Sequence, residues 1–361
     1  MLQIPFYDPK KSYQENFEQG PFSDLTNGEK IVRVGQPTNI FLGQQVYLPF
    51  GIPAGPLLNE KYVTAAFNKG FDICVYKTVR TREYPCHPWP NILSVKVDGD
   101  LTLQRAEMPL HSEIDYNEPL SITNSFGVPS MSPDFWQEDM AKAVSNTGVG
   151  QVMIGSFQGT KKEGGSAQDL IADYVLAAKL VKATGAKILE ANLSCPNEGT
   201  ADLLCFDTKR VRLIAERIKN EIGNTPLILK LAYFKDQTHL RNYIRAVGSI
   251  IDGLSVINTI AAPIVTATGE QALPGEGRLH SGVCGAAIKW AGLEMVQRIR
   301  KLRREFKQKF MIIGVGGVTV KDDYFAYKKA GADAVMSATG AMWNPFLAIE
   351  ITKVAITQKG K

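Results

Sequence analysis

Short apolar runs alternate with longer amphipathic segments along the chain from about residue 47 onward. Most of the short runs are aliphatic or β-branched throughout, which is typical of parallel strands that are covered on both faces. The pattern predicts eight strands, at residues 47–54, 72–77, 151–156, 187–192, 227–231, 253–258, 310–314 and 333–338.

The segments between these runs have the spacing of amphipathic helices. Residues 166–184, 207–222 and 318–330 are the clearest examples, and in the third Thr319 and Asp322 have the spacing of a capping box. Repeated strand–helix units in one chain predict an α/β fold, a closed (β/α)8 TIM barrel. A doubly wound open sheet is the competing interpretation.

Two connections are far longer than the usual two to six residues. Residues 78–133 follow the second predicted strand and residues 259–285 follow the sixth. Both would leave the C-terminal ends of barrel strands, where active sites lie, so these insertions are candidates for a substrate lid. Residues 1–46 are polar and aromatic, and we expect them to form an extension that packs on the barrel bottom. Residues 47–361 would then form the catalytic domain.

Composition narrows the class of protein. The 361 residues contain 41 Lys and Arg against 36 Asp and Glu, a net charge of +5 without a run of like charge, so nucleic acid is not indicated. The five cysteines form no C-x-x-C pair and the four histidines lack ligand spacing, which argues against a metal or iron–sulfur site. No stretch approaches the roughly 20 apolar residues of a membrane span, and we expect a cytoplasmic protein.

Polar residues gather at the C-terminal ends of the predicted strands. In a barrel these ends meet on one rim. Each residue alone has a structural explanation, since Asn and Thr cap helices and a lone Lys is common. Together they predict a binding site, made of Lys77, Thr78, Asn192, Cys195, Asn197, Lys230, Asn258 and Thr259.

Glycines follow the last two predicted strands. The seventh is followed by Gly316-Gly317 and the eighth by Thr339-Gly340. Small residues at these places let backbone N–H groups approach a phosphate. The pair of motifs predicts a phosphorylated ligand, although one glycine motif alone would be weak evidence.

Cys195 has an unusual setting among the cysteines. It follows a buried strand and precedes Pro196, with Asn192 and Asn197 nearby. A free thiol has a pKa near 8.5, so a modest perturbation would make it a base or nucleophile near neutral pH. The alternative is a small buried hydrophobe. The remaining cysteines, Cys74, Cys86, Cys205 and Cys284, are interpreted as structural.

Four segments resemble the dihydroorotate dehydrogenases, in that family's order. They are Ile122-Thr-Asn-Ser-Phe-Gly-Val-Pro129, Glu190-Ala-Asn-Leu-Ser-Cys-Pro-Asn197, Ser281-Gly-Val-Cys-Gly-Ala-Ala-Ile-Lys289 and Ile312-Ile-Gly-Val-Gly-Gly317. The N-L-S-C-P-N part is highly specific, and the resemblance extends over roughly residues 47 to 350. It implies FMN at the barrel mouth and oxidation of dihydroorotate to orotate in pyrimidine biosynthesis.

The resemblance also implies roles for individual residues. Cys195 would be the base, hydride would pass to the flavin N5, and Lys230 would stabilise negative charge on the reduced flavin. The substrate would contact Lys77, Asn124, Phe126, Gly127, Val128, Asn192, Asn197, Asn258 and Thr259. The flavin would contact Ala54, Gly55, Lys77, Thr78, Asn192, Lys230, Asn258, Ser281, Gly282, Gly316, Gly317, Thr339 and Gly340.

The base position and the N-terminus indicate a subclass. The family's membrane class uses serine as base and has an apolar N-terminal helical domain, whereas this chain has Cys195 and a polar N-terminus. It therefore resembles the soluble class 1, usually homodimeric, whose electron acceptor is fumarate or a partner subunit with FAD and an iron–sulfur cluster. Residues 83–91 depart from the class pattern, which leaves the lid contacts and subunit packing open.

Three other functions remain open on the sequence alone. A dihydrouracil-type dehydrogenase would use the same barrel and the same cysteine. An aldolase-type barrel would use Lys230 as a Schiff base, but it has no need of an asparagine-rich rim. A regulatory barrel that binds flavin without turnover is the third, and it is disfavoured by the presence of Cys195 and Lys230.

Overall fold

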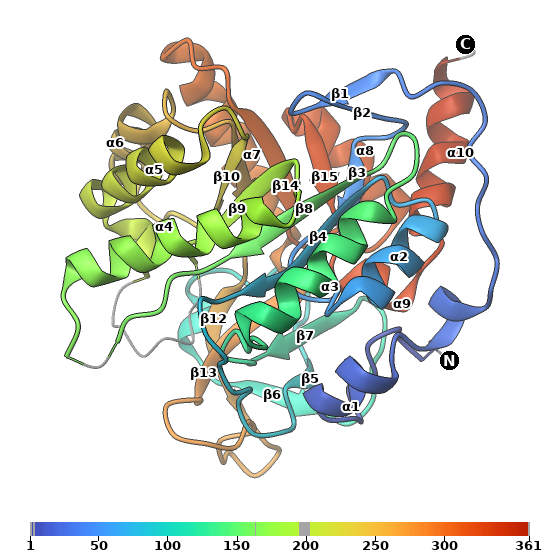
Figure 1. Cartoon of the computed structure of the whole chain (residues 1–361). Coiled ribbons are helices and arrows are strands. Elements are labelled where there is room, and N and C mark those ends of the chain that lie inside the picture. Colours follow the sequence, from blue (N-terminus) through green and yellow to red (C-terminus); the bar gives the residue numbers. More distant parts are fainter. Residues whose placement is uncertain (1, 3, 163, 195–202, 360–361) are drawn as a thin grey trace.

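Eight parallel strands close into a barrel in the computed structural model, which describes residues 2, 4–162, 164–194 and 203–359 (Figure 1). Closure confirms the predicted (β/α)8 fold and excludes the open sheet. Each predicted strand is present: β3 (Phe50–Ile52), β4 (Ile73–Val79), β8 (Val152–Phe157), β9 (Ile188–Asn192), β10 (Leu227–Leu231), β11 (Gly253–Val256), β14 (Met311–Val315) and β15 (Ala334–Met336).

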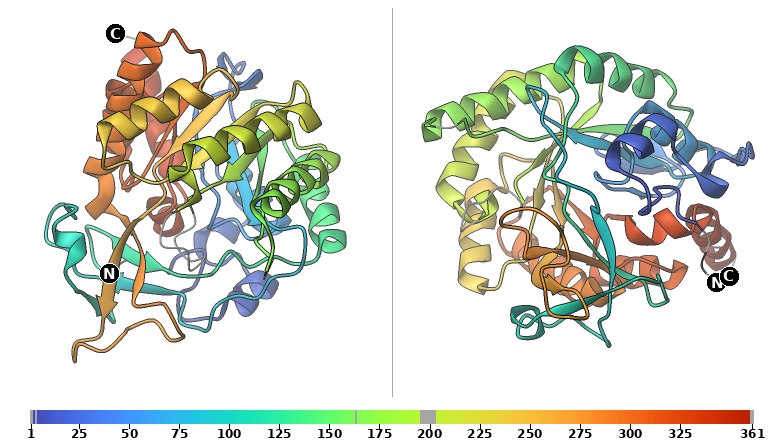
Figure 2. Two further views of the ribbon diagram at one scale, coloured as in Figure 1. Left: turned by 90° about the vertical axis from the view of Figure 1, so that its left-hand side faces the viewer. Right: turned by 90° about the horizontal axis from the view of Figure 1, so that it is seen from below.

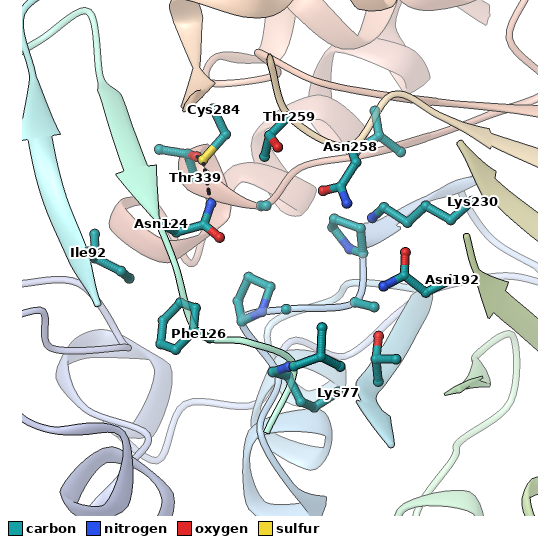
Figure 3. Close-up of a pocket in the computed structure, with 18 of the residues that line it drawn as sticks. Lys77, Ile92, Asn124, Phe126, Asn192, Lys230, Asn258, Thr259, Cys284 and Thr339 are labelled. Atoms are coloured by element: carbon teal, nitrogen blue, oxygen red, sulfur yellow. Dashed lines mark hydrogen bonds between the residues drawn. The ribbon is translucent and has the colours of Figure 1, made fainter. Parts of the chain in front are cut away.

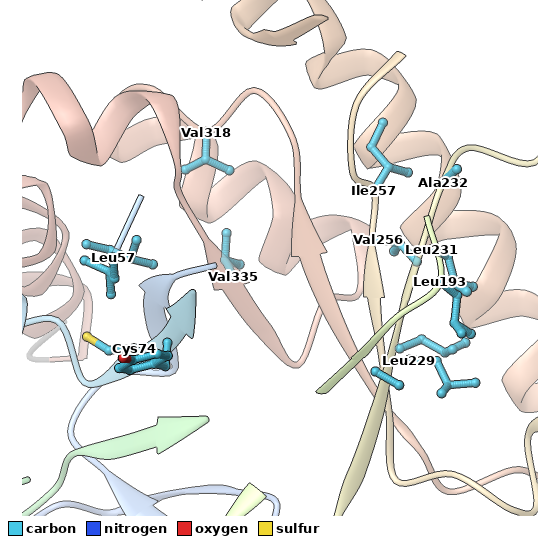
Figure 4. Close-up of a cluster of buried hydrophobic side chains, with 14 of the residues drawn as sticks. Leu57, Cys74, Leu193, Leu229, Leu231, Ala232, Val256, Ile257, Val318 and Val335 are labelled. Atoms are coloured by element: carbon cyan, nitrogen blue, oxygen red, sulfur yellow. The ribbon is translucent and has the colours of Figure 1, made fainter. Parts of the chain in front are cut away.

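Both faces of the barrel strands are buried, which explains why the apolar runs show no alternation with polar residues. On β4, Ile73 and Val75 belong to the apolar cluster inside the barrel, whereas Cys74 and Tyr76 belong to the core between strands and helices. Figure 4 shows part of that outer core, including Leu229 of β10.

Helices surround the barrel, as the view from below in Figure 2 shows. Those in the layer outside the strands are α2 (Glu60–Asn68), α3 (Pro133–Ser145), α4 (Ala167–Ala183), α5 (Thr208–Ile222), α6 (Gln237–Val247), α7 (Lys289–Glu305), α8 (Lys321–Ala330) and α10 (Leu347–Lys359). A short helix, α9 (Thr339–Trp343), follows β15, and 3-10 turns lie at Ser23–Thr26, Arg105–Glu107, Leu204–Phe206 and Ala286–Ile288.

The start of α8 differs from the prediction. Asp323, and not Asp322, caps this helix: its carboxylate accepts the backbone N–H of Thr319 at 2.9 Å and of Val320 at 3.0 Å. The helix begins at Lys321, because Val320 is still extended.

The two long insertions, after the second and sixth barrel strands as predicted, form one sheet. Its strands are β5 (Ile92–Val95), β6 (Leu110–Glu113) and β7 (Ser121–Asn124) from the first insertion, with β12 (Ile260–Val265) and β13 (His280–Gly285) from the second. β7 pairs with β13 and β12 pairs with β6, so that the five strands close on themselves. The two candidate lid segments are therefore hydrogen-bonded to each other, and we call them the insertion sheet.

The N-terminal residues reach both ends of the barrel (Figure 1). The hairpin of β1 (Asn39–Phe41) and β2 (Gln44–Val46) places Phe41 and Val46 in the apolar cluster inside the barrel, at the end away from the insertion sheet. Helix α1 (Tyr13–Gln19) lies near the insertion sheet instead, and the backbone N–H of Phe6 donates to Met342 of α9 at 3.0 Å. The hairpin therefore packs at the bottom of the barrel, as we expected of the whole extension. The residues before it, including Phe6 and α1, pack beside the end that carries the insertion sheet.

Candidate active site

A cavity of about 1020 Å³, including its opening, lies at the C-terminal ends of the barrel strands. It brings together most of the site residues predicted from the sequence: Ala54, Gly55, Lys77, Thr78, Asn124, Phe126, Gly127, Val128, Asn192, Lys230, Asn258, Thr259 and Thr339.

Asn192, Lys230 and Asn258 form the barrel side of this cavity (Figure 3). They stand at or just beyond the ends of β9, β10 and β11. The amide of Asn192 donates to Oε1 of Gln158 at 2.7 Å, and the amide of Asn258 donates to the carbonyl of Ser194 at 2.9 Å. These bonds fix the planes of both amides, and so determine which of their atoms are free to contact a ligand.

A polar layer lies below this rim, inside the barrel. The hydroxyls of Thr78 and Ser156 are 3.0 Å apart, and Ser156 donates to Oε1 of Glu190 at 3.2 Å. Burial raises the pKa of Glu190, and the ammonium of Lys230 acts against that rise. Burial likewise lowers the pKa of Lys230, and Glu190 opposes that change. Each charge therefore favours the charged form of the other in the barrel interior.

Asn124, Cys284 and Thr339 lie opposite, on the side formed by the insertion sheet and α9 (Figure 3). Sγ of Cys284 accepts from the Asn124 amide at 3.4 Å and from the Thr339 hydroxyl at 3.5 Å. The sequence led us to interpret Cys284 as structural, and the pairing of β13 with β7 places it in the lining of the cavity. Burial raises its pKa, which favours the neutral thiol.

Residues 126–128 form a strained loop at the cavity wall. Gly127 has a φ of +75° and Val128 a φ of +54°, which is rare for a β-branched residue. Arg80 donates to the carbonyls of both, at 3.1 Å to Gly127 and 2.9 Å to Val128, and His87 N–H donates to the carbonyl of Phe126 at 3.0 Å. Within the described residues the N–H groups of Gly127 and Val128 have no acceptor, so they are available to an anion.

Five predicted site residues do not line the cavity. The hydroxyl of Ser281 is bonded to that of Thr123 at 2.5 Å. A Cβ on Gly282 would approach the Thr259 hydroxyl to 2.3 Å, and one on Gly317 would approach Lys289 to 2.5 Å. These glycines therefore allow close packing of the chain around the cavity. Gly316 and Gly340 are also outside the lining.

Cys195 and Asn197 fall outside the residues that the structure describes. The described chain stops at Ser194, which is directly before Cys195 and hydrogen-bonded to Asn258 of the cavity.

Several lining residues were not predicted. Most of them are ordinary apolar residues whose positions depend on tertiary packing, so no local pattern distinguishes them. They are Tyr7, Pro53, Pro56, Ile92, Ile122, Ile257, Cys284, Val315, Ala338 and Met342. Tyr7 is the most remote in sequence, and the aromatic character of the N-terminal segment was its only signal.

The described part of the chain contains neither a metal-ligand cluster nor a membrane-spanning helix. None of its His, Cys, Asp and Glu side chains form a group of three or more that could hold a metal ion. No helix in those residues combines the length and apolar character needed to cross a bilayer.

Comparisons with known proteins agree with this geometry. The family model described as dihydroorotate dehydrogenase matches residues 114–356. A dihydroorotate dehydrogenase of Dictyostelium discoideum is 35% identical over 361 aligned residues, covering 96% of both chains. The catalytic subunit of dihydroorotate dehydrogenase B (NAD(+)) from Staphylococcus carnosus is 31% identical over 180 residues, covering 50% of this chain and 56% of that protein.

A solved structure shares the fold. The dihydroorotate dehydrogenase of Eimeria tenella, in complex with ferulenol, superposes with a TM-score of 0.67 at 19% identity, covering 88% of this chain and 84% of that one. The sequence matches establish the relationship more closely than the fold alone. The chain belongs to the dihydroorotate dehydrogenase family and is an oxidoreductase that acts on CH–CH donors.

Proposed function

We propose that this protein is an FMN-dependent dihydroorotate dehydrogenase of the soluble, cysteine-base class 1, oxidising (S)-dihydroorotate to orotate in pyrimidine biosynthesis. The observation that carries the proposal is the single cavity that gathers Lys77, Asn124, Asn192, Lys230 and Asn258 from five different strands or strand ends. A flat ring rich in amide groups needs paired donors and acceptors, which three asparagines supply.

The residues around the cavity fit FMN. Gly55 has a φ of +138°, and a Cβ there would meet no protein atom within 4 Å, so a flat ring can approach the backbone. The N–H groups of Gly316, Gly317 and Gly340 donate to none of the described residues, which suits a phosphate. Ser281 and Gly282 would contact the flavin from β13 of the insertion sheet. When bound, FMN supplies a hydride acceptor at its N5.

Substrate binding would divide between the two sides of the cavity. Asn124, Asn192 and Asn258, with Asn197 and Thr259, would hydrogen-bond the pyrimidine ring. The substrate carboxylate would lie against the free N–H groups of Gly127 and Val128, with the ammonium of Lys77 as its counter-charge. This arrangement distinguishes dihydroorotate from dihydrouracil, which lacks the carboxylate.

Proton transfer would rest on Cys195. Its thiolate would remove the proton from the carbon next to the ring carbonyl, where that carbonyl acidifies it. Lys230, whose charged form Glu190 favours against the effect of burial, would hold positive charge beside the flavin ring where electrons accumulate. Cys195 would thus accept the proton that leaves the substrate, and Lys230 would provide the positive charge beside the flavin.

The partners and the domain division are part of the same proposal. Residues 47–361 would be the catalytic domain and residues 1–46 an extension packed on it, in a cytoplasmic homodimer. Electrons would leave to fumarate or to a partner subunit that carries FAD and an iron–sulfur cluster. The relatedness to catalytic subunits named for NAD(+) supports the second acceptor, and the full-length match to the Dictyostelium protein leaves the first open.

The experiment is a comparison of two substrates with an artificial dye as acceptor. The proposal expects turnover of dihydroorotate to exceed that of dihydrouracil at least a hundredfold. Dihydrouracil has no carboxylate, so it cannot form the charge-assisted hydrogen bonds proposed for that group. The reverse preference would favour a dihydrouracil-type dehydrogenase on the same barrel.

A further inference from the structure

Tyr7 lies in the cavity although it belongs to the N-terminal extension. Its side chain is only 2% exposed, and its hydroxyl has no hydrogen-bond partner among the described residues. Burial raises the pKa of this phenol well above its usual range, so the hydroxyl keeps its proton and remains a donor. An unpartnered, buried donor on a residue that lines a cavity points to an acceptor on the ligand.

The segment that carries Tyr7 is held firmly in place. Next to it, the backbone N–H of Asp8 donates to the side chain of Asn16 at 2.8 Å, and that side chain donates back to the carbonyl of Asp8 at 2.9 Å. The hydroxyl of Tyr62 in α2 donates to the backbone carbonyl of Asn16 at 2.8 Å, which holds Asn16 in place. Together with the bond from Phe6 to α9, these contacts fix Tyr7 before a ligand binds.

Tyr7 stands at the end of the cavity where the carboxylate would bind. Its ring packs edge-on against Phe126 with centroids 5.7 Å apart. The phenol therefore belongs to the same end of the cavity as Phe126 and the strained loop 126–128.

We propose, on the basis of the function above, that Tyr7 is a substrate-binding residue whose hydroxyl donates a hydrogen bond to the carboxylate of dihydroorotate or orotate. The N-terminal extension thereby completes a binding site that the barrel and the insertion sheet leave one donor short. It contributes to the selection of a carboxylated pyrimidine over an uncharged one.

The test compares Tyr7→Phe, which removes only the oxygen, with Tyr13→Phe. Tyr13 is in the same segment and its ring also contacts Phe126, at 6.1 Å, but it lines a different cavity. Calorimetric titration of the purified holoprotein should show orotate binding about tenfold to a hundredfold weaker in Tyr7→Phe. Tyr13→Phe should bind orotate within threefold of the unaltered protein, and both variants should bind uracil as the unaltered protein does.

Thermal unfolding provides a second readout. Because the hydroxyl is unpartnered without ligand, Tyr7→Phe should melt at the same temperature as the unaltered protein or higher, and should gain less from added orotate. Unchanged orotate affinity overturns the contact, and an equal loss for uracil overturns its assignment to the carboxylate. Failure of the unaltered protein to bind orotate would overturn the proposed function, and this inference with it.

Discussion

The two sides of the cavity are built in different ways. Asn192 and Lys230 project from strands that are paired on both edges within a closed sheet. The opposite side carries Asn124 and the loop 126–128, which come from an insertion and are oriented by contacts such as those of Arg80. Strand pairing within the barrel fixes the residues of the first side. Contacts between segments far apart in the sequence fix those of the second.

The contrast suggests a division of labour. The barrel side holds the buried ionisable side chains of Lys230 and Glu190, which suit the chemistry of electron and proton transfer. The insertion side holds free backbone donors and Tyr7, which suit recognition of the substrate. Changes on the barrel side should therefore slow the reaction, whereas changes on the insertion side should weaken substrate binding.

Cys195→Ser should have the largest effect. Serine is a much weaker acid than cysteine, so at this site it would be a far poorer base at neutral pH, and reduction of the flavin by dihydroorotate should slow about a thousandfold. Rapid-mixing absorbance without oxygen measures this rate, and the FMN content serves as the control for intact folding. Reduction at a near-normal rate would remove Cys195 from the mechanism.

Lys230→Met should come next. Loss of the ammonium should slow flavin reduction about a hundredfold and lower the midpoint potential of the bound flavin, because reduced flavin would lose its counter-charge. Lys289→Met is the matched control, since Lys289 does not line the cavity and pairs with Asp323 at 2.8 Å. An unaltered potential in Lys230→Met would break the assignment of charge chemistry to the barrel side.

Arg80→Lys should affect binding more than rate. The rigid guanidinium of Arg80 donates to two carbonyls at once, and the single ammonium of a lysine cannot do so. The loop 126–128 should therefore relax, and orotate affinity should fall about tenfold. Arg82→Lys is the control, because Arg82 donates to the carbonyl of Thr160 at 3.3 Å and not to the loop. If the maximal rate falls while orotate affinity is kept, the proposed division between the two sides is wrong.

Cys284→Ser should have the smallest effect. A hydroxyl keeps an acceptor for Asn124 and Thr339, so flavin reduction and orotate affinity should each change less than about threefold. The same two assays apply. A loss comparable to that of Cys195→Ser would show that the wrong thiol had been assigned as the base.

The barrel was predictable because its signal is local. A strand such as β10, Leu227–Leu231, reads as an apolar run with one lysine, and both features follow from a doubly covered strand whose end reaches a cavity. Lys230, Asn192 and Asn258 were found for that reason.

The insertion side was less predictable because its signal is not local. β7 and β13 lie about 160 residues apart in the sequence, so the position of Cys284 beside Asn124 has no signature in either segment. Tyr7 was missed for the same reason. The local pattern also predicted the wrong capping residue for α8. Asp322 and Asp323 are adjacent in the sequence, and only the folded structure shows that Asp323 accepts the backbone N–H of Thr319.

The central claim is most directly tested by adding dihydroorotate to the purified protein in the absence of oxygen while recording its visible absorption. The account predicts a flavin spectrum that bleaches within seconds, with one orotate formed per flavin. A flavin spectrum that persists with dihydroorotate but bleaches with another dihydropyrimidine, or a protein that takes up no FMN, would contradict it.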